Sequence, residues 1–311
     1  MHPLDAAILR TLLYADVFDY AMRLHELHRY LIHYEVVPLA HLETRLKTST
    51  RLQELLIHQD DLICLKINRN HIEKRQLRLT YMATLSAQVR RYSRWLATVP
   101  FVRMVALTGA IAVENPAKAN DDLDFMMIVE PGRVWLARAF SIVLVRLGRL
   151  QGVEICPNYV TASNRLQQTR CDLYIAHEIA QLVPLFDDDL YPAFWTENGW
   201  HQDWLPNSTP LSAEEPVRPY LPLKRVLEWL LGGRLGMWLE RWEYRRKSHK
   251  FLQGPQPHDS SARINSDEVK GHFNDHGAAV LAAYEERLAA YGLKMTPVDE
   301  APAQVFSQCA K

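Results

Sequence analysis

The pattern of apolar positions predicts three short helices and a small β-hairpin at the start of the chain. Apolar residues recur at close to helical spacing in residues 4–18 and again in residues 24–33. Pro38 fits the first turn of a third helix, because proline is tolerated where a helix begins. The following DDLICLKINRN alternates apolar and polar residues, which predicts a strand that begins after its two aspartates.

Three helices followed by a strand pair are the plan of a winged helix, so we expect a winged-helix-like module over residues 1–70. Such modules often bind DNA, through basic residues on the third helix and a basic, glycine-rich wing. Here no such wing follows, and the third helix mixes charges of both signs: Arg45, Lys47, Arg51, Glu43 and Glu54. DNA binding and a docking or dimerisation role therefore both remain open for this module.

Residues 71–98 predict a long connecting helix in which arginines alternate with apolar and aromatic residues. Residues 99–205 then alternate strand and helix signals. They predict strands at FVRMVALTG, DDLDFMMIV and VEICPNYVTA, a helix over residues 134–150, and a later helix that is stopped at Pro184. The expected fold class is α+β, with helices on a mixed sheet.

Residues 206–311 predict a linker and a helical C-terminal region. Five prolines between positions 206 and 222 indicate an extended arm or linker. The next helical segment is broken at Gly232 and Gly233, and the last helix ends at Gly292. Between these helices, the polar segment 253–268 is expected to be mobile.

The composition excludes strong whole-chain electrostatic attraction to nucleic acid or anionic lipid. The chain of 311 residues has 36 basic and 36 acidic residues, so its formal net charge is zero. The four cysteines are scattered and form no C-x-x-C pair, which argues against a zinc ribbon and a disulfide framework. We expect a cytoplasmic protein.

No membrane span is expected either. Asp5 and Asp16 lie among the first twenty residues, where a signal peptide would need a basic region and an uninterrupted apolar core. The most apolar helix candidate, residues 134–150, is interrupted by three arginines and falls short of the roughly 20 apolar residues that a membrane span needs. We therefore expect this segment to be a packed helix.

Two carboxylates, Asp122 and Asp124, stand where the second core strand begins. Because side chains alternate along a strand, these two point to the same face, about 7 Å apart. Paired carboxylates repel each other unless a cation lies between them, and Mg²⁺ typically binds one or two carboxylates together with substrate phosphates. Upstream, the small residues Gly109 and Ala110 would let backbone N–H groups approach a phosphate closely. The pattern predicts a metal-phosphate site.

An apolar strand, a glycine with a small residue, and then Asp-x-Asp in an apolar strand resemble the signature of the DNA polymerase β-like nucleotidyltransferase superfamily. More loosely, the chain is similar to uncharacterised bacterial nucleotidyltransferase-like proteins over LTGAIA, NDDLDFMMIVEPGRVWLAR, ICPNYV and DLYIAHEI. The resemblance implies a nucleotidyltransferase-like mixed sheet and a nucleoside triphosphate held through Mg²⁺ or Mn²⁺. It also implies transfer of a nucleotidyl group to an acceptor hydroxyl, on a small molecule, a protein or a nucleic acid.

The resemblance also implies roles for individual residues. Asp122 and Asp124 would bind the metal, and a third carboxylate on the next strand would complete the metal pair. Glu154 is the candidate for that carboxylate and Asp172 the reserve, although Glu154 is also consistent with an exposed surface acid. Thr108, Gly109 and Ala110 would contact the triphosphate. Lys118 and Arg133, which flank the acids, either neutralise phosphate oxygens or are solvated loop charges.

One departure from the family pattern bears on activity. The superfamily usually has a serine after the glycine, and this chain has Ala110. Backbone amides can still bind phosphate without that hydroxyl. The sequence therefore also allows a catalytically inactive nucleotide-binding sensor, or a winged-helix DNA-binding regulator, on the same scaffold.

Overall fold

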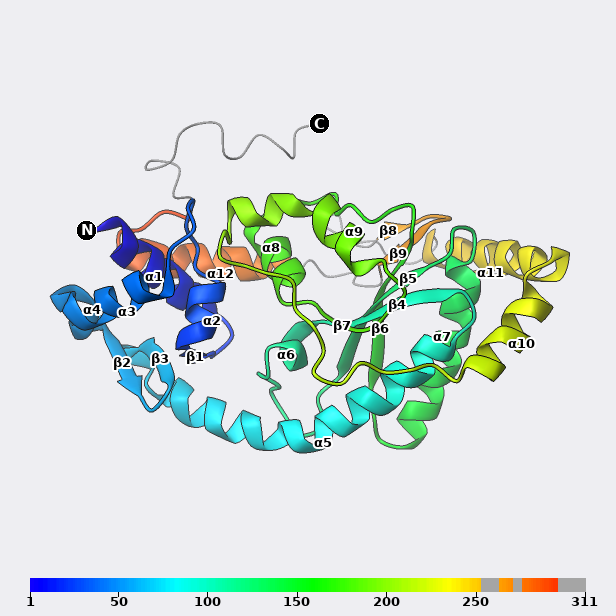
Figure 1. Ribbon diagram of the computed structural model, residues 1–311, viewed down its shortest axis with the longest axis horizontal. Coiled ribbons are helices and arrows are strands. Elements are labelled where there is room, and N and C mark those ends of the chain that lie inside the picture. Colours follow the sequence, from blue (N-terminus) through cyan, green and yellow to red (C-terminus); the bar gives the residue numbers. More distant parts are fainter. Residues whose placement is uncertain (253–262, 271–275, 296–311) are drawn as a thin grey trace.

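The computed structural model describes residues 1–252, 263–270 and 276–295, and they form an α+β structure with two open sheets (Figure 1). The smaller sheet belongs to the N-terminal part and has the strand order β1-β3-β2, with both pairs antiparallel. The N-terminal elements are α1 (Pro3–Asp16), β1 (Met22–Arg23), α2 (Leu24–Arg29), α3 (Leu39–Thr48), α4 (Thr50–Leu55), β2 (Leu56–Gln59) and β3 (Leu62–Leu65).

The third predicted helix is divided in two at Ser49. This residue has extended backbone, and its hydroxyl accepts a hydrogen bond from the backbone N–H of Leu52, which caps the start of α4. The same hydroxyl donates to the buried carboxylate of Asp5 on α1. The break therefore ties the α3–α4 junction to the first helix.

A short 3-10 turn, η1 (Lys66–Asn68), leads into the long helix α5 (Asn70–Thr98), which runs from the small sheet to the large one (Figure 1). The large sheet has the order β7-β4-β5-β6-β9-β8, in which only β5 and β6 are parallel. Its strands are β4 (Val102–Leu107), β5 (Leu123–Val129), β6 (Ile155–Ala162), β7 (Val183–Asp187), β8 (Arg263–Ile264) and β9 (Glu268–Lys270).

The remaining helices lie between the strands of the large sheet along the chain, or after them. They are α6 (Gly109–Ala112), α7 (Val134–Leu150), α8 (Leu173–Ala180), α9 (Tyr191–Glu197), η2 (Gly199–Asp203), α10 (Leu221–Leu231), α11 (Arg234–Leu252) and α12 (His276–Ala290). The predicted break at Gly232 and Gly233 and the predicted helix end near Gly292 are both confirmed. Helix α7 packs on the sheet as expected, and no described helix is long and apolar enough to cross a membrane.

The sequence prediction was wrong at β7. The predicted helix that would run to Pro184 ends at Ala180, and the following residues form a strand that pairs with β4. Proline cannot donate a ladder hydrogen bond and is therefore confined mostly to edge strands. Strand β7 lies at one edge of the large sheet, which explains why it accommodates this residue.

The sequence prediction was also wrong for part of the polar segment 253–268. Residues 253–262 lie outside the described residues. Beyond them, β8 and β9 form a hairpin that extends the large sheet from β6. The side chain of Val269 is buried there and supplies the apolar contact that anchors this otherwise polar hairpin.

The two faces of the large sheet carry different layers. Along β5, Leu123, Phe125 and Met127 point toward α5 and α7, while Met126 and Ile128 point toward the N-terminal part, α8, α9 and α12. This alternation follows from the two-residue period of a strand. The N-terminal part therefore shares one apolar cluster with a face of the large sheet, and that is the face toward which the two aspartates also point.

A buried arginine fixes the N-terminal part against the large sheet. Arg75 on α5 has no exposed surface, donates to Glu26 on α2 at 3.0 Å, and donates to the carbonyl oxygen of Val113 at 2.8 Å. Its guanidinium also lies over the ring of Tyr20, 4.7 Å from the centroid. One side chain thus joins the connecting helix, the small module and the loop that follows α6.

The predicted linker is an extended arm, as expected. Residues 204–220 form no helix or strand and run from the N-terminal part to the edge of the large sheet (Figure 1). At one end the Asn207 amide donates to the carbonyl oxygen of His28, and further along the backbone N–H of Val217 donates to the carbonyl oxygen of Leu185. The arm therefore connects α2 of the N-terminal part to β7 of the large sheet.

His177 makes the stability of this packing dependent on pH. Its ring is buried, stacks on Tyr14 of α1 with the centroids 4.0 Å apart, and donates from Nδ1 to the carbonyl oxygen of Leu173. Burial lowers the pKa of His177 to about 4, whereas an unfolded histidine titrates near 6.5. Between these pH values the unfolded chain binds more protons, so this residue makes the fold less stable as the pH falls.

We expect His177 to account for a loss of about 2 kcal/mol in the free energy of unfolding between pH 7.5 and pH 5. Urea denaturation at both pH values should show that the wild type loses about this much stability relative to His177→Phe, because groups such as Asp124 titrate in both proteins. The exposed His41 provides the matched control, since His41→Phe should keep the wild-type dependence. Identical pH dependence in the wild type and His177→Phe would contradict this account.

Candidate functional site

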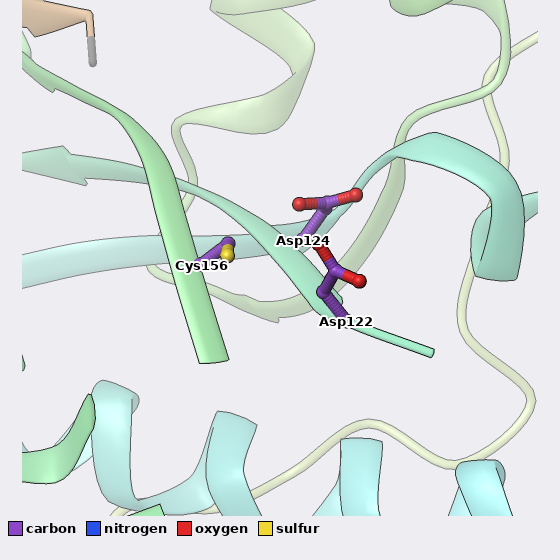
Figure 2. Close-up of side chains that lie close together, drawn as sticks. All are labelled: Asp122, Asp124 and Cys156. Atoms are coloured by element: carbon purple, nitrogen blue, oxygen red, sulfur yellow. The ribbon is translucent and has the colours of Figure 1, made fainter. Parts of the chain in front are cut away.

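The two aspartates stand side by side on one face of the large sheet. Asp122 immediately precedes β5 and Asp124 is its second residue, while Leu123 between them is fully buried on the opposite face. Figure 2 shows both carboxylates beside Cys156, which comes from the neighbouring strand β6. One ligand atom from each of these three side chains lies within 4.8 Å of the other two.

A glycine turn closes against Asp124. Gly109 has a φ of +69°, a conformation that L side chains rarely adopt. A Cβ atom at this position would lie 2.7 Å from Oδ2 of Asp124, too close for any side chain. The backbone N–H of Thr108 donates to the carbonyl oxygen of Asp124 at 3.0 Å. The glycine of the sequence pattern is therefore required for both its backbone conformation and its proximity to the acid.

A β-bulge brings a polar side chain to the same carboxylate. The parallel pairing of β5 and β6 shifts after Phe125, so that Pro157 and Tyr159 face consecutive β5 residues and Asn158 is the extra residue. The Asn158 amide nitrogen donates a short hydrogen bond to Oδ1 of Asp124. Bulges often redirect side chains beside functional sites, and this one supplies a hydrogen bond to the half-buried carboxylate.

Burial dominates the electrostatics of the site. It raises the pKa of Asp124 to about 7, the Asn158 hydrogen bond opposes this rise, and the neighbouring Asp122 adds to it. Burial, followed by the two aspartates, raises the pKa of the Cys156 thiol to about 12. Both pKa values are raised, and a nearby positive charge would lower them again by stabilising the ionised groups. The site therefore favours a cation.

The structure does not bring Glu154 to this site. It precedes β6, its side chain is 51% exposed, and it lies 3.5 Å from Nη2 of Arg149. Cys156 occupies the position beside the aspartates instead. The reserve candidate, Asp172, accepts a hydrogen bond from the backbone N–H of Ile175 and so caps α8. Neither predicted third carboxylate lies in the cluster.

The donor set fits a hard divalent cation held mainly by two oxygens. Mg²⁺ is often bound through one or two carboxylates with water and substrate oxygens, and Mn²⁺ accepts similar ligands. A protonated thiol is a weak third donor, so Cys156 contributes less than a third carboxylate would. Among the described cysteines, Cys64 and Cys156 are free.

A cavity of about 470 Å³ opens beside the aspartates. Its walls come from the large sheet, α8, α12 and the N-terminal part, and the two parts of the chain together enclose it. Much of the lining is apolar or aromatic. Its polar residues include three carboxylates and two cations: Asp122, Asp124, Glu178, Arg170 and Lys270.

Glu178 is the carboxylate of this cavity that lies outside the aspartate cluster. Burial raises its pKa, while Lys270 and a hydrogen bond with Tyr174 oppose the rise. The sequence alone hardly indicates that Glu178 lines a cavity, because one acid beside His177 on an amphipathic helix is a common pattern. Only the packing of α8 against the sheet turns Glu178 toward the cavity.

The other predicted residues divide between the cavity and the surface. Thr108, Gly109 and Ala110 line the cavity. Lys118 is exposed in the loop before β5, and the structure does not place it in the cavity lining. Arg133 follows the opposite end of β5, where it donates to the carbonyl oxygen of Gly232 at 2.8 Å and lies over a phenylalanine ring. Arg133 is therefore a structural residue remote from the acids.

Comparisons with known proteins add no relative to this picture. No protein-family model matches the chain, and no curated protein matches it.

Proposed function

We propose that the protein is a Mg²⁺-dependent nucleotidyltransferase. The observation that carries this proposal is the convergence of Asp122 and Asp124 behind the Gly109 turn, at the edge of a cavity large enough for a small ligand. The resemblance in sequence pattern agrees with this reading. Mn²⁺ is the alternative metal, since the same oxygen donors accept it.

The chain's own residues would bind and orient the substrates. Asp122 and Asp124 would hold the cation, which would neutralise charge on the triphosphate and on the leaving pyrophosphate. Arg170 and Lys270 provide positive charge on the cavity wall. The backbone from Thr108 to Ala110 offers a close approach to phosphate oxygens, because the Gly109 position admits no side chain.

The cavity favours a small-molecule acceptor. Its aromatic lining includes Tyr14 and Tyr174, which can bury an apolar or planar group, and it lies between two packed parts of the chain. The acceptor oxygen would attack the α-phosphorus, the bond to the bridging oxygen of pyrophosphate would break, and Glu178 would accept the hydroxyl proton. A raised pKa suits a carboxylate to that task.

A non-catalytic nucleotide sensor is the second candidate. Two observations favour it: Ala110 lacks the hydroxyl of the usual serine, and Cys156 stands beside the aspartates where a third carboxylate is expected. Both would weaken catalysis more than binding. Titration with Mg²⁺ and each nucleoside triphosphate distinguishes the two functions, because a sensor binds without releasing pyrophosphate.

A DNA-binding regulator receives little support from α3 and α4, which stand where the sequence predicted a single third helix. Arg45 forms an ion pair with the buried Asp5, and Arg51 lies 3.9 Å from Glu54. Two of the three basic residues there are therefore occupied by contacts within the chain. Salt-dependent retardation of duplex DNA by the full chain would be the evidence in favour of a DNA-binding regulator.

Substitution of either aspartate tests the proposed metal site. We expect Asp122→Asn and Asp124→Asn each to lower metal-dependent pyrophosphate release by at least about 100-fold, because each removes an anionic ligand. The fold should persist, since each change relieves repulsion between the carboxylates. Asp121→Asn is the matched control, because Asp121 accepts a hydrogen bond from the N–H of Ala117 in the turn. Full turnover in either variant would exclude the mechanism.

A pair of glycine variants separates backbone strain from crowding of the site. Gly109 and Gly132 have nearly equal φ values, +69° and +70°, but a Cβ atom at Gly132 meets nothing within 4 Å. Gly132→Ala should lower the free energy of unfolding by about 1 kcal/mol through backbone strain alone, and Gly109→Ala should lower it by more, because its Cβ atom also collides with Asp124. Only Gly109→Ala should also weaken Mn²⁺ and nucleotide binding, measured calorimetrically. Equal Mn²⁺ and nucleotide binding by the two variants would show that binding does not require the space that Gly109 leaves beside Asp124.

The proton acceptor can be tested in the same way. Glu178→Gln should lower kcat by about 10²-fold or more while nucleotide KM stays nearly unchanged, because the loss falls on proton transfer. Glu154→Gln, a change at the exposed acid, should keep full activity. If instead Glu154→Gln is the slow variant, the assignment of the base is wrong.

A further inference from the structure

The molecule exposes an unusual concentration of large apolar side chains on α10 and α11. Ten of the twenty exposed large apolar side chains of the described residues lie between positions 220 and 242. A concentration of exposed apolar side chains on one part of a protein surface often marks a binding surface. Helices α10 and α11 form the end of the molecule opposite α1, so neither the N-terminal part nor the cavity covers them (Figure 1).

Tryptophans are the most prominent members of this patch. Trp229 is 81% exposed, Trp238 is 60% exposed and Trp242 is 49% exposed. The rings of Trp238 and Trp242 are stacked, with centroids 6.4 Å apart, at the one-turn spacing that puts them on one helix face. Leu235 and Val226 add exposed aliphatic surface to the same pair of helices.

The exposed charges of this patch have one sign. Between positions 218 and 248, every charged side chain in the exposed class is an arginine: Arg218, Arg225, Arg234, Arg241, Arg245 and Arg246. The three glutamates of the segment are buried or half-buried, and Glu243 is paired with Arg246. The segment is therefore locally basic although the whole chain has no net charge.

The inward face of the helix pair is fully engaged with the core. Glu240 accepts hydrogen bonds from the backbone N–H groups of Trp135 and Leu136, and so caps the start of α7. Glu228 accepts from the N–H of Phe101 at 2.8 Å. These contacts fix the orientation of α10 and α11, so the outer apolar and basic face is a permanent surface of the fold.

We propose that this outer face binds the surface of an anionic phospholipid bilayer. Tryptophan and leucine on one face with arginine around them is the composition of a helix that lies in a membrane interface. A second copy is a poorer occupant, because a two-fold interface would place arginines against arginines with no exposed acid among them. Single-stranded nucleic acid would use the tryptophans but leave the aliphatic side chains unburied.

Vesicle sedimentation with the full chain tests this proposal. The protein should bind vesicles that contain about one third phosphatidylglycerol much more tightly than pure phosphatidylcholine vesicles, and added salt should weaken the binding. Arg234→Gln/Arg241→Gln/Arg245→Gln and, separately, Trp229→Gln/Trp238→Gln should each reduce the partition coefficient by about tenfold or more. All five positions are exposed, so circular dichroism and thermal melting should match the wild type.

Matched controls remove the same groups elsewhere. Lys66→Gln/Arg69→Gln/Arg91→Gln removes three exposed cations, and Ile67→Gln/Leu77→Gln removes two exposed apolar side chains. Both controls should bind vesicles like the wild type. Three results would overturn the proposal: no binding at low salt, equal loss in the controls, or self-association that Trp229→Gln/Trp238→Gln abolishes. Binding of single-stranded DNA in preference to vesicles would also overturn it.

Discussion

The site depends on one half-buried carboxylate, Asp124, that is largely desolvated by its surroundings. Its side chain projects from a strand whose other residues are almost all buried, so desolvation raises its pKa toward neutrality. Three features of the fold accommodate this: Gly109 leaves space for Oδ2, the extra residue of the β6 bulge donates to Oδ1, and Asp122 stands on the same face. An isolated pair of half-buried acids would repel each other, whereas the same pair beside a cation becomes a binding site.

The N-terminal part acquires a clear structural role from its packing. Its helices share an apolar cluster with one face of the large sheet, and Arg75 and the extended arm hold it there. Because it supplies part of the cavity wall, its position determines the size of the space beside the aspartates. The four helices and the antiparallel sheet of this part therefore help to form the cavity, whatever else their surface binds.

The sequence predicts the parts of the site that obey local rules. The two-residue period of a strand places Asp122 and Asp124 on one face, and the glycine before them marks a tight approach. Other parts depend on residues distant in sequence. Glu178 faces the cavity only because α8 packs on the sheet, and Cys156 replaces Glu154 because the register of β6 decides which side chain lies beside β5. Strand β7 was mistaken for helix because its proline is acceptable only at a sheet edge, and a sheet edge is a property of the whole fold.

The two proposed surfaces lie at opposite ends of β5, and this separation constrains the acceptor. The aspartates stand at the start of the strand, whereas Arg133, which holds the turn between α10 and α11, follows its end. Seven residues of strand span about 20 Å. A molecule resting on a bilayer through α10 and α11 would thus hold its cavity well away from the lipid surface. An acceptor embedded among acyl chains could not reach the aspartates, so a membrane-bound enzyme of this shape would act on a water-soluble acceptor.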